Sequence, residues 1–410
     1  MLIFSIFFHP SRKITFLGGA EKRFLEFLKF LSLNVNGKVE IIILEPEPSL
    51  IFNNNHKVKK VVVSQPFKVK SRNLPLNYLG WITWSLKATV FSIPIVFRMK
   101  PDLILAPNNT LPNILPAFLV KALFKKPLCV TVHHFDLYAE KSEKVNLSLK
   151  NFFKTYRNLG YSFFTSICKA LASTLAVKLL EKAEFFISVS NFTASKLRLL
   201  GISKDRILIS GNGAYSKKNF EVYCGKEKRF DAVFVGRIAL EKGIYDLLEA
   251  WKLVVSKFRE AKLAVVGEGP ELEKVKVKIE KLGLENNFSV FGGVPDKQMK
   301  KIVCNSKIFV FPSRFEGWGI AVAEALASGL PVVCYEIPAL KEVFGDCESV
   351  FFVSKFNSKS LAEKILEVLN SFDVEFFRRK SLDFAKKFDW KQVFSKDLQF
   401  LFDLKNKGIK

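Results

Sequence analysis

The sequence has few cysteines and histidines, and neither residue type is spaced like a metal site. Six cysteines and four histidines occur among 410 residues, and no two cysteines form a C-x-x-C pair. Because no set of ligands has zinc-like spacing, we expect no bound metal. The cysteines lie far apart and mostly in apolar segments, so they are predicted to be buried, reduced thiols.

A secretion signal and a clean membrane-spanning run are also missing. The first apolar segment, Leu2–Phe8, has no preceding basic region and no small-residue cleavage site, so it is predicted to be a strand. Lys87 and Pro94 interrupt the most apolar long stretch, residues 81–97, which falls short of about 18 to 20 clean residues. We therefore expect a cytoplasmic protein without a spanning helix. A helix lying on the inner membrane surface is compatible with this pattern.

Acidic residues are scarce. There are 39 Asp and Glu against 64 Lys and Arg, which gives a net charge of +25 and predicts an anionic partner. No helix-turn-helix, zinc-finger, KH or RRM signature is present, so a specific nucleic-acid partner is not expected. A phosphate-bearing substrate and an acidic membrane surface remain as candidates. The aromatic and basic stretches 77–100 and 150–182 favour weak membrane association, and core helices are the alternative explanation of both.

The arrangement of apolar segments predicts two α/β domains. The chain is too long for one ordinary core, and short β-rich runs alternate with amphipathic helical stretches. The polar stretch Asn212–Arg229 separates two such series. We predict domains at 1–215 and 228–386, and a last helix within 387–410. The predicted strands are Leu2–Phe8, Val39–Leu44, Lys60–Val63, Asp102–Ala106, Leu128–His133, Phe185–Val189, Arg206–Ser210, Asp231–Val235, Lys262–Val266, Phe288–Phe291, Ile308–Phe311, Pro331–Tyr335 and Val350–Val353.

The most informative motif follows the strand that ends at Phe311. A turn containing Gly317 and Gly319 leads into an Ala-rich helix, and ligands of open α/β sheets bind at such strand ends. Seven residues separate Glu316 in the turn from Glu324 in the helix, so both carboxylates are predicted to face one cleft. Carboxylates accept strong hydrogen bonds from sugar or ribose hydroxyls. As isolated residues, a turn cap and a surface glutamate would be the commoner explanation.

The strand ending at Val235 is followed by the motif Gly236-Arg237-Ile238-Ala239-Leu240-Glu241-Lys242-Gly243. Arg237 and Lys242 can converge on a diphosphate there. The N-terminus of the helix that begins near Gly243 would add its partial positive charge.

Three weaker motifs also lie at the ends of predicted strands. The tight loop with Gly267 and Gly269 allows the backbone to approach a ligand closely. Gly19 stands in a glycine pair at a helix start, where backbone N–H groups can meet phosphate oxygens. His133 and His134 end an apolar strand and suggest a substrate-facing edge, although a satisfied core histidine would give the same pattern.

Taken in order along the chain, these motifs resemble glycosyltransferase family 4, the group 1 transferases. The resemblance implies a GT-B fold, in which two Rossmann-like domains face each other across a cleft. It further implies a retaining transferase that needs no metal or other cofactor, in agreement with the lack of an Asp-x-Asp motif. One departure is that Ala214 and Tyr215 stand where the family has an aliphatic residue followed by Asp.

The resemblance also implies roles for individual residues. Arg237 and Lys242 would hold the diphosphate of a nucleotide-sugar donor, and Glu324 the ribose. Glu316 and His133 would contact the transferred sugar. Backbone near the donor would come from Gly19, Gly267, Gly269, Gly317 and Gly319. The helix from Trp390 onward would cross back to the first domain, and the acceptor would be a glycan or a lipid-linked molecule.

Two other functions remain open at this point. A GT-B nucleotide-sugar 2-epimerase has the same fold and donor but no acceptor. A basic nucleotide- or lipid-binding protein without catalysis would tolerate loss of Glu316.

Overall fold

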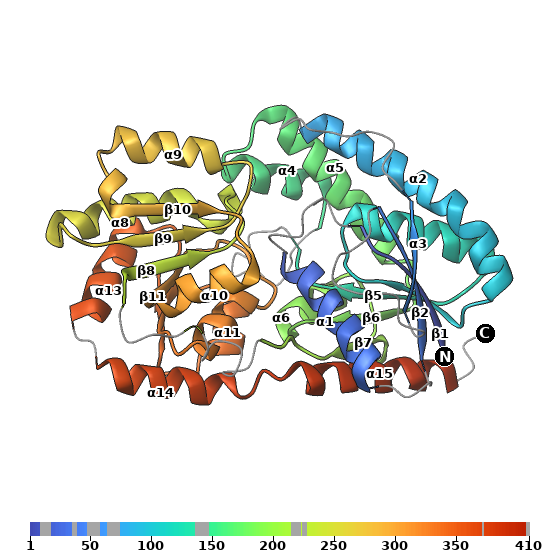
Figure 1. Ribbon diagram of the computed structural model, residues 1–410. Helices are drawn as coiled ribbons and strands as arrows, with labels where there is room; N and C mark the ends of the chain where they lie inside the picture. Colours follow the sequence, from blue (N-terminus) through green and yellow to red (C-terminus); the bar gives the residue numbers. More distant parts are fainter. Residues whose placement is uncertain are drawn as a thin grey trace. The chain divides into compact units, whose positions relative to one another are not determined.

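The computed structural model describes residues 1–8, 18–34, 39–46, 58–63, 74–135, 147–214, 223, 228–370 and 373–406. The chain divides into two compact units (Figure 1). The first contains strands β1 (Leu2–Ile6) to β7 (Ile207–Ile209) and the C-terminal helix α15 (Trp390–Asn406). The second runs from β8 (Phe230–Val235) to α14 (Val374–Ala385). Most of the linker predicted at 212–229, with Tyr215, lies outside the described residues.

The first unit is built on a parallel sheet with the strand order β3-β2-β1-β4-β5-β6-β7. Its middle strands are completely buried on both faces, as expected for a parallel sheet covered by helices. The strands between β1 and β7 are β2 (Glu40–Glu45), β3 (Val58–Val62), β4 (Leu103–Ala106), β5 (Leu128–Val132) and β6 (Phe185–Ser188).

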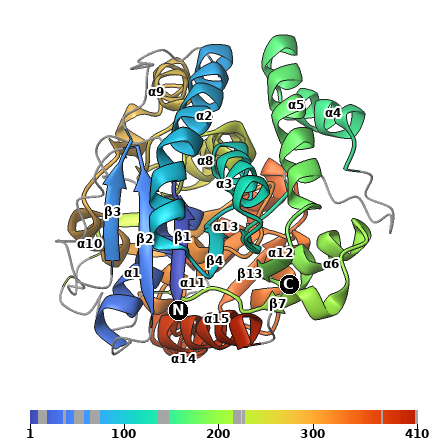
Figure 2. The same ribbon diagram turned by 90° about the vertical axis from the view of Figure 1, so that its right-hand side faces the viewer.

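Helices α2 (Leu74–Met99), α3 (Leu111–Phe124) and α5 (Phe163–Leu180) cover one face of this sheet. Trp84, Ile114 and Leu180 from the three helices join a single apolar cluster with alternate strand residues such as Ile104. Figure 2 shows α2 and α5 on either side of α3. The unit also contains α1 (Gly19–Asn34), α4 (Leu149–Asn158) and α6 (Asn191–Leu199).

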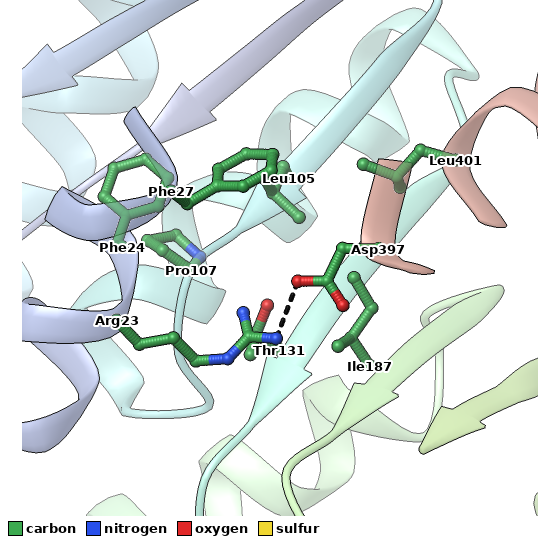
Figure 3. A pocket seen from close by; sticks show the side chains of 9 residues that line it. All are labelled: Arg23, Phe24, Phe27, Leu105, Pro107, Thr131, Ile187, Asp397 and Leu401. Carbon is green, nitrogen blue, oxygen red and sulfur yellow. Dashed lines mark hydrogen bonds and ion pairs between the residues drawn. The ribbon is translucent and has the colours of Figure 1, made fainter. Parts of the chain in front are cut away.

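The C-terminal helix α15 is attached to the first unit by a buried ion pair. Arg23 of α1 donates to Asp397 Oδ2 at 2.6 Å and to Ser210 Oγ at 2.9 Å, and both charged residues are buried. Figure 3 shows this pair beside a small hollow, lined in part by Thr131 and Leu401. Burial raises the pKa of Asp397, while the Arg23 guanidinium acts in the opposite direction. A buried charge of this kind requires its partner, so the pair fixes the position of α15 on α1.

The second unit has a six-stranded parallel sheet in the order β10-β9-β8-β11-β12-β13. This order reverses direction at β8, as in a dinucleotide-binding Rossmann sheet. Strands β9 to β13 span Leu263–Val266, Phe288–Gly292, Ser306–Phe311, Val332–Tyr335 and Val350–Val353. The helices before α14 are α8 (Ile244–Lys257), α9 (Leu272–Lys281), α10 (Asp296–Cys304), α11 (Ile320–Ala327), α12 (Pro338–Phe344) and α13 (Ser358–Asn370).

The α/β class with two Rossmann-like units is therefore confirmed, and each predicted strand appears with small shifts at its ends. The prediction of reduced cysteines is wrong for Cys304, which is disulfide-bonded. The prediction relied on the wide spacing of the cysteines along the sequence, and cysteines that are far apart in the sequence can be close together in the fold. Cys129, Cys334 and Cys347 are free and buried, and Cys168 is free and half-buried.

Helix α2 continues through Pro94 to Met99. Within the described residues, two helical segments, Leu79–Met99 and Phe163–Leu180, are long and apolar enough to cross a membrane by length and composition alone. Core helices of soluble proteins pass the same test.

Candidate active site

The candidate site lies on three loops at one edge of the second sheet. Strand β8 pairs with β9 on one side and with β11 on the other, so the carboxyl ends of the three strands are neighbours. The loops that follow them are 236–243, 267–271 and 312–319. Ligands of open α/β sheets bind at this kind of edge, where the strand order reverses.

Backbone hydrogen bonds join the three loops. Ile238 N donates to Glu268 O at 2.8 Å, and Glu271 N donates back to Ile238 O at 3.1 Å. Arg314 N donates to Glu241 O at 2.9 Å and so joins the first loop to the third. These bonds satisfy backbone groups away from the strand ladders, and they hold the loops in one arrangement.

Two glycines allow the loops to approach this closely. A Cβ atom on Gly269 would lie 2.2 Å from Ile238 O, and one on Gly243 would lie 2.0 Å from Pro312 O. Gly243 also has a φ of 67°, in the left-handed region that favours glycine. Side chains are therefore excluded at both positions for steric reasons.

An ion pair between Lys242 and Glu316 forms the centre of the site. Lys242 Nζ lies 2.5 Å from Glu316 Oε1, and Ser313 donates its hydroxyl hydrogen to the same oxygen at 2.9 Å. The two charged side chains are about one fifth and one seventh exposed, so they are partly shielded from water but still accessible. A cation and a carboxylate are thus held side by side at the ends of β8 and β11.

The two arginines of these loops also pair with carboxylates. Arg237 binds Glu241, although its guanidinium is more than half exposed. Arg314 makes a two-pronged contact with Asp246 of α8, with N–O distances of 2.7 and 3.1 Å. Such bidentate pairs are geometrically specific. The second pair therefore fixes the 312–319 loop against α8, which begins directly after Gly243.

Glu324 lies on α11, half-buried, eight residues beyond Glu316 along the chain. It lines a hollow together with Val235, Met299 and Phe309, which come from β8, α10 and β11. Gly319 caps α11 with a φ of 100°, and a Cβ there would lie 2.5 Å from Leu340. Gly317 is buried in the preceding turn.

His133 lies in the first unit, directly after β5. Its ring Nε2 lies 3.2 Å from Pro107 O, and its backbone N–H donates to Asn109 Oδ1. Burial, together with the positive charge of Arg23, lowers the pKa of His133 to about 3. The imidazole is therefore neutral at physiological pH. Gly19 is the exposed first residue of α1.

The structure thus brings eight of the predicted residues to one sheet edge. These are Arg237, Lys242, Gly267, Gly269, Glu316, Gly317, Gly319 and Glu324. Gly19 and His133 lie on elements outside that sheet, and the roles of all ten stay predictions. Sequence reasoning gave no role to Ser313 or to the Arg314–Asp246 pair. The position of Ser313 three residues before Glu316 was the one available signal.

The chain contains two Rossmann-like units, as the GT-B class of protein does, and the solved structures that it resembles over its full length have the GT-B fold. Within the second unit, residues 216–376 match the family described as glycosyl transferases group 1. The resemblance inferred from the sequence motifs is thereby confirmed.

Individual relatives point to the same family. The chain is 30% identical over 145 residues to a poly(glycerol-phosphate) alpha-glucosyltransferase of Bacillus subtilis, covering 35% of this chain and 21% of the relative. It is 29% identical over 295 residues to a putative teichuronic acid biosynthesis glycosyltransferase of the same organism, covering 70% of this chain and 67% of the relative. The chain thus spans between about a fifth and two thirds of these relatives.

A solved structure supports the fold over the full length. The Anabaena protein HepE, in complex with UDP and glucose, superposes with a TM-score of 0.69 at 16% identity. The similarity covers 98% of each chain.

Proposed function

We propose that the protein is a retaining glycosyltransferase that moves a sugar from a nucleotide-diphosphate donor to a glycan or lipid-linked acceptor. The observation that carries this proposal is the Lys242–Glu316 pair at the switch point of a group 1 domain. A nucleotide sugar carries an anionic diphosphate next to a hydroxyl-bearing ring. The pair offers a cation for the first group and a carboxylate for the second.

Each charged group then has a defined part in donor binding. Lys242, Arg237 and the N-terminus of α8 bind the diphosphate, because all three carry positive charge on one loop. Glu316 accepts hydrogen bonds from the sugar, and Glu324 from the ribose. In this proposal side chains and a helix end supply the charge stabilisation, so transfer proceeds without a metal ion.

Retention of configuration follows if the acceptor hydroxyl attacks the face from which the diphosphate departs. The bond between the anomeric carbon and the phosphate oxygen breaks, and the acceptor oxygen forms the new bond to that carbon. The departing phosphate oxygen takes the acceptor's proton. Lys242 and Arg237 stabilise the charge that grows on the diphosphate.

The donor and acceptor classes draw support from the relatives. HepE was solved with UDP and glucose, which makes UDP-sugars the first donors to test. The two Bacillus relatives are named for poly(glycerol-phosphate) and teichuronic acid, both of them anionic polymers. A peripheral position at the inner membrane surface belongs to the same proposal, since it gives access to a lipid-linked acceptor.

The test is a panel of UDP-, GDP- and ADP-sugars with EDTA present. A bound donor raises the melting temperature by mass action, and the selected donor should then release nucleoside diphosphate when an acceptor is added. NMR of the product should show the anomeric configuration of the donor. A strict requirement for Mg²⁺ or an inverted product contradicts the proposal, and a free epimerised nucleotide sugar supports the epimerase instead.

A further inference from the structure

Helix α2 is apolar on the side that faces the sheet and also on the side that faces outward. Trp84, Ala88 and Val96 point inward and are buried in the core of the first unit. The outward side carries a row of exposed apolar residues spaced three or four apart, as one helix face requires. These are Leu79, Ile82, Leu86, Val90, Ile93 and Phe97.

Helix α5 repeats this arrangement. Ala176, Val177 and Leu180 are buried, while Phe164, Leu171 and Leu175 form an exposed row at intervals of seven and four residues. Phe164 has 74% of its surface exposed, and Phe97 of α2 has 73%. Large aromatic side chains exposed to this degree are costly in water, because each leaves apolar area uncovered.

The two exposed rows lie on helices that cover the same face of the first sheet, and both rows point away from that sheet. Both helices pack on α3 and cover the sheet face described above (Figure 2). Within the described residues, 13 of the 20 exposed large hydrophobic residues lie on α2, α3, α4 and α5. Apolar surface gathered in this way marks an interaction site. We call the exposed apolar rows of α2 and α5 the outer face.

Charge on these helices has one sign. The sequences of α2, α3, α4 and α5 contain no Asp or Glu. They carry eight basic residues, namely Lys87, Arg98, Lys121, Lys150, Lys154, Arg157, Lys169 and Lys178, of which Lys121 forms an ion pair with Glu184, just beyond α5. The outer face is therefore an apolar surface bordered by cations.

We propose that the outer face inserts shallowly into a membrane leaflet that contains anionic lipids. Apolar rows match the acyl chains, and the cations match the lipid phosphates, as in helices that lie in the membrane interface. A second copy of the chain would place like charges against each other. A nucleic acid would leave the apolar rows exposed to water. This inference rests on the membrane position in the proposed function and names the surface that would make the contact. Vesicle binding requires no catalysis, so its failure can be told apart from a failure of the proposed transfer activity.

Flotation of the full chain with two vesicle types tests the proposal. One type is phosphatidylcholine alone, and the other contains phosphatidylglycerol as well. The wild-type chain should float with the anionic vesicles and bind less as salt is raised. Substituting both Lys150 and Lys154 with Gln should weaken binding about 30-fold, from roughly 1 kcal/mol per cation.

The apolar part is tested by a triple substitution, Leu86→Ser, Val90→Ser and Phe97→Ser. Binding to anionic vesicles should fall about 100-fold even at low salt. The matched control changes the same three residue types on the second unit, namely Leu253→Ser, Val277→Ser and Phe258→Ser, which are also exposed. The control should bind vesicles like the wild type. Circular dichroism and nucleotide binding should be unchanged in both triple variants.

Several results overturn the proposal. Equal binding to neutral and anionic vesicles removes the role of the cations, and wild-type binding by the Leu86/Val90/Phe97 variant removes the role of the apolar rows. A lipid-free dimer that this variant converts to monomer shows that a second copy covers the face. Release from membranes by detergent alone, and not by alkaline carbonate, shows that a helix spans the bilayer.

Discussion

Breaking the Lys242–Glu316 pair from either side should have opposite effects on nucleotide binding. Glu316 Oε1 lies 2.5 Å from Lys242 Nζ and forms an ion pair with it. An incoming diphosphate must therefore compete with this carboxylate for the cation. Glu316→Gln keeps the size of the side chain and removes the competing charge, so Lys242 becomes fully available to phosphate.

The size of the effect follows from the surroundings of the pair. Both side chains are mostly buried but reach solvent, so their attraction exceeds that of an exposed pair, which is at most about 1 kcal/mol. Releasing about 1 kcal/mol of competition should tighten nucleoside diphosphate binding about fivefold in Glu316→Gln. Lys242→Gln removes a charge-assisted hydrogen bond of about 1.5 to 3 kcal/mol and should weaken binding about 10- to 100-fold.

Glu324→Ala provides the comparison, because this carboxylate is assigned to the ribose and has no part in the pair. Its loss should weaken nucleoside diphosphate binding about 10- to 100-fold. Glu316→Gln should instead turn over slowly at saturating donor, since its contact with the sugar strengthens as the sugar–phosphate bond breaks.

Calorimetry with nucleoside diphosphate and single-turnover rates at saturating donor separate these effects for all three variants. The reasoning is refuted if Glu316→Gln binds nucleotide as weakly as Glu324→Ala does while it turns over at the wild-type rate.

Three further predictions concern stability, each measured by denaturant unfolding. Gly243→Ala should lower the free energy of unfolding more than Gly283→Ala does. Both glycines have a φ near 65°, but only a Cβ at position 243 would collide with the backbone. Equal losses of stability in the two variants contradict this. Asp397→Asn should lower the free energy of unfolding by about 3 to 5 kcal/mol, because it leaves Arg23 buried without a counter-charge. Adding Arg23→Met should restore part of the lost stability. Unfolded His133 takes up a proton near pH 6.5, whereas the folded residue stays neutral down to about pH 3, so stability should fall by about 2 kcal/mol from pH 7.5 to pH 5 through this group. The stability of His133→Asn should lack that part of the pH dependence. If stability falls with pH as steeply in this variant as in the wild type, a neutral, buried His133 is not the cause.

The fold could be predicted from the sequence because each strand can be recognised from a short run of its own residues. Runs such as 231–235 and 262–266 are apolar on both faces, which is typical of strands in a parallel sheet with helices on either side. Residues between them follow the helical period. The length of α2 was harder to predict, since Lys87 and Pro94 interrupt its apolar stretch in the sequence. The helix continues because its other residues still pack on the core through Trp84, Ala88 and Val96.

The candidate site could be predicted as a set of residues but not as a set of contacts. Lys242 and Glu316 were each assigned to a ligand, and nothing in their spacing of 74 residues indicates that they bind each other. Arg314 and Asp246 are 68 residues apart, and Arg23 and Asp397 are 374 apart. Such pairs depend on which helices and strands become neighbours in the fold. Ser313 is an exception, because its contact with Glu316 is local.

The structure shows which parts of the chain carry cations without acidic residues on the same helices. At the candidate site, Arg237, Lys242 and Arg314 each face a carboxylate, so the cations there are matched one by one. A ligand binds at such a site by exchanging partners, and the site contributes little to a net charge of +25. Helices α2 to α5 contain cations and no acidic residue at all. Long-range attraction depends on net charge, because the fields of two opposite charges a few ångströms apart largely cancel at distances well beyond their separation. The basic character of the chain should therefore act at the outer face of the first unit, and donor recognition should depend on short-range geometry at the second sheet.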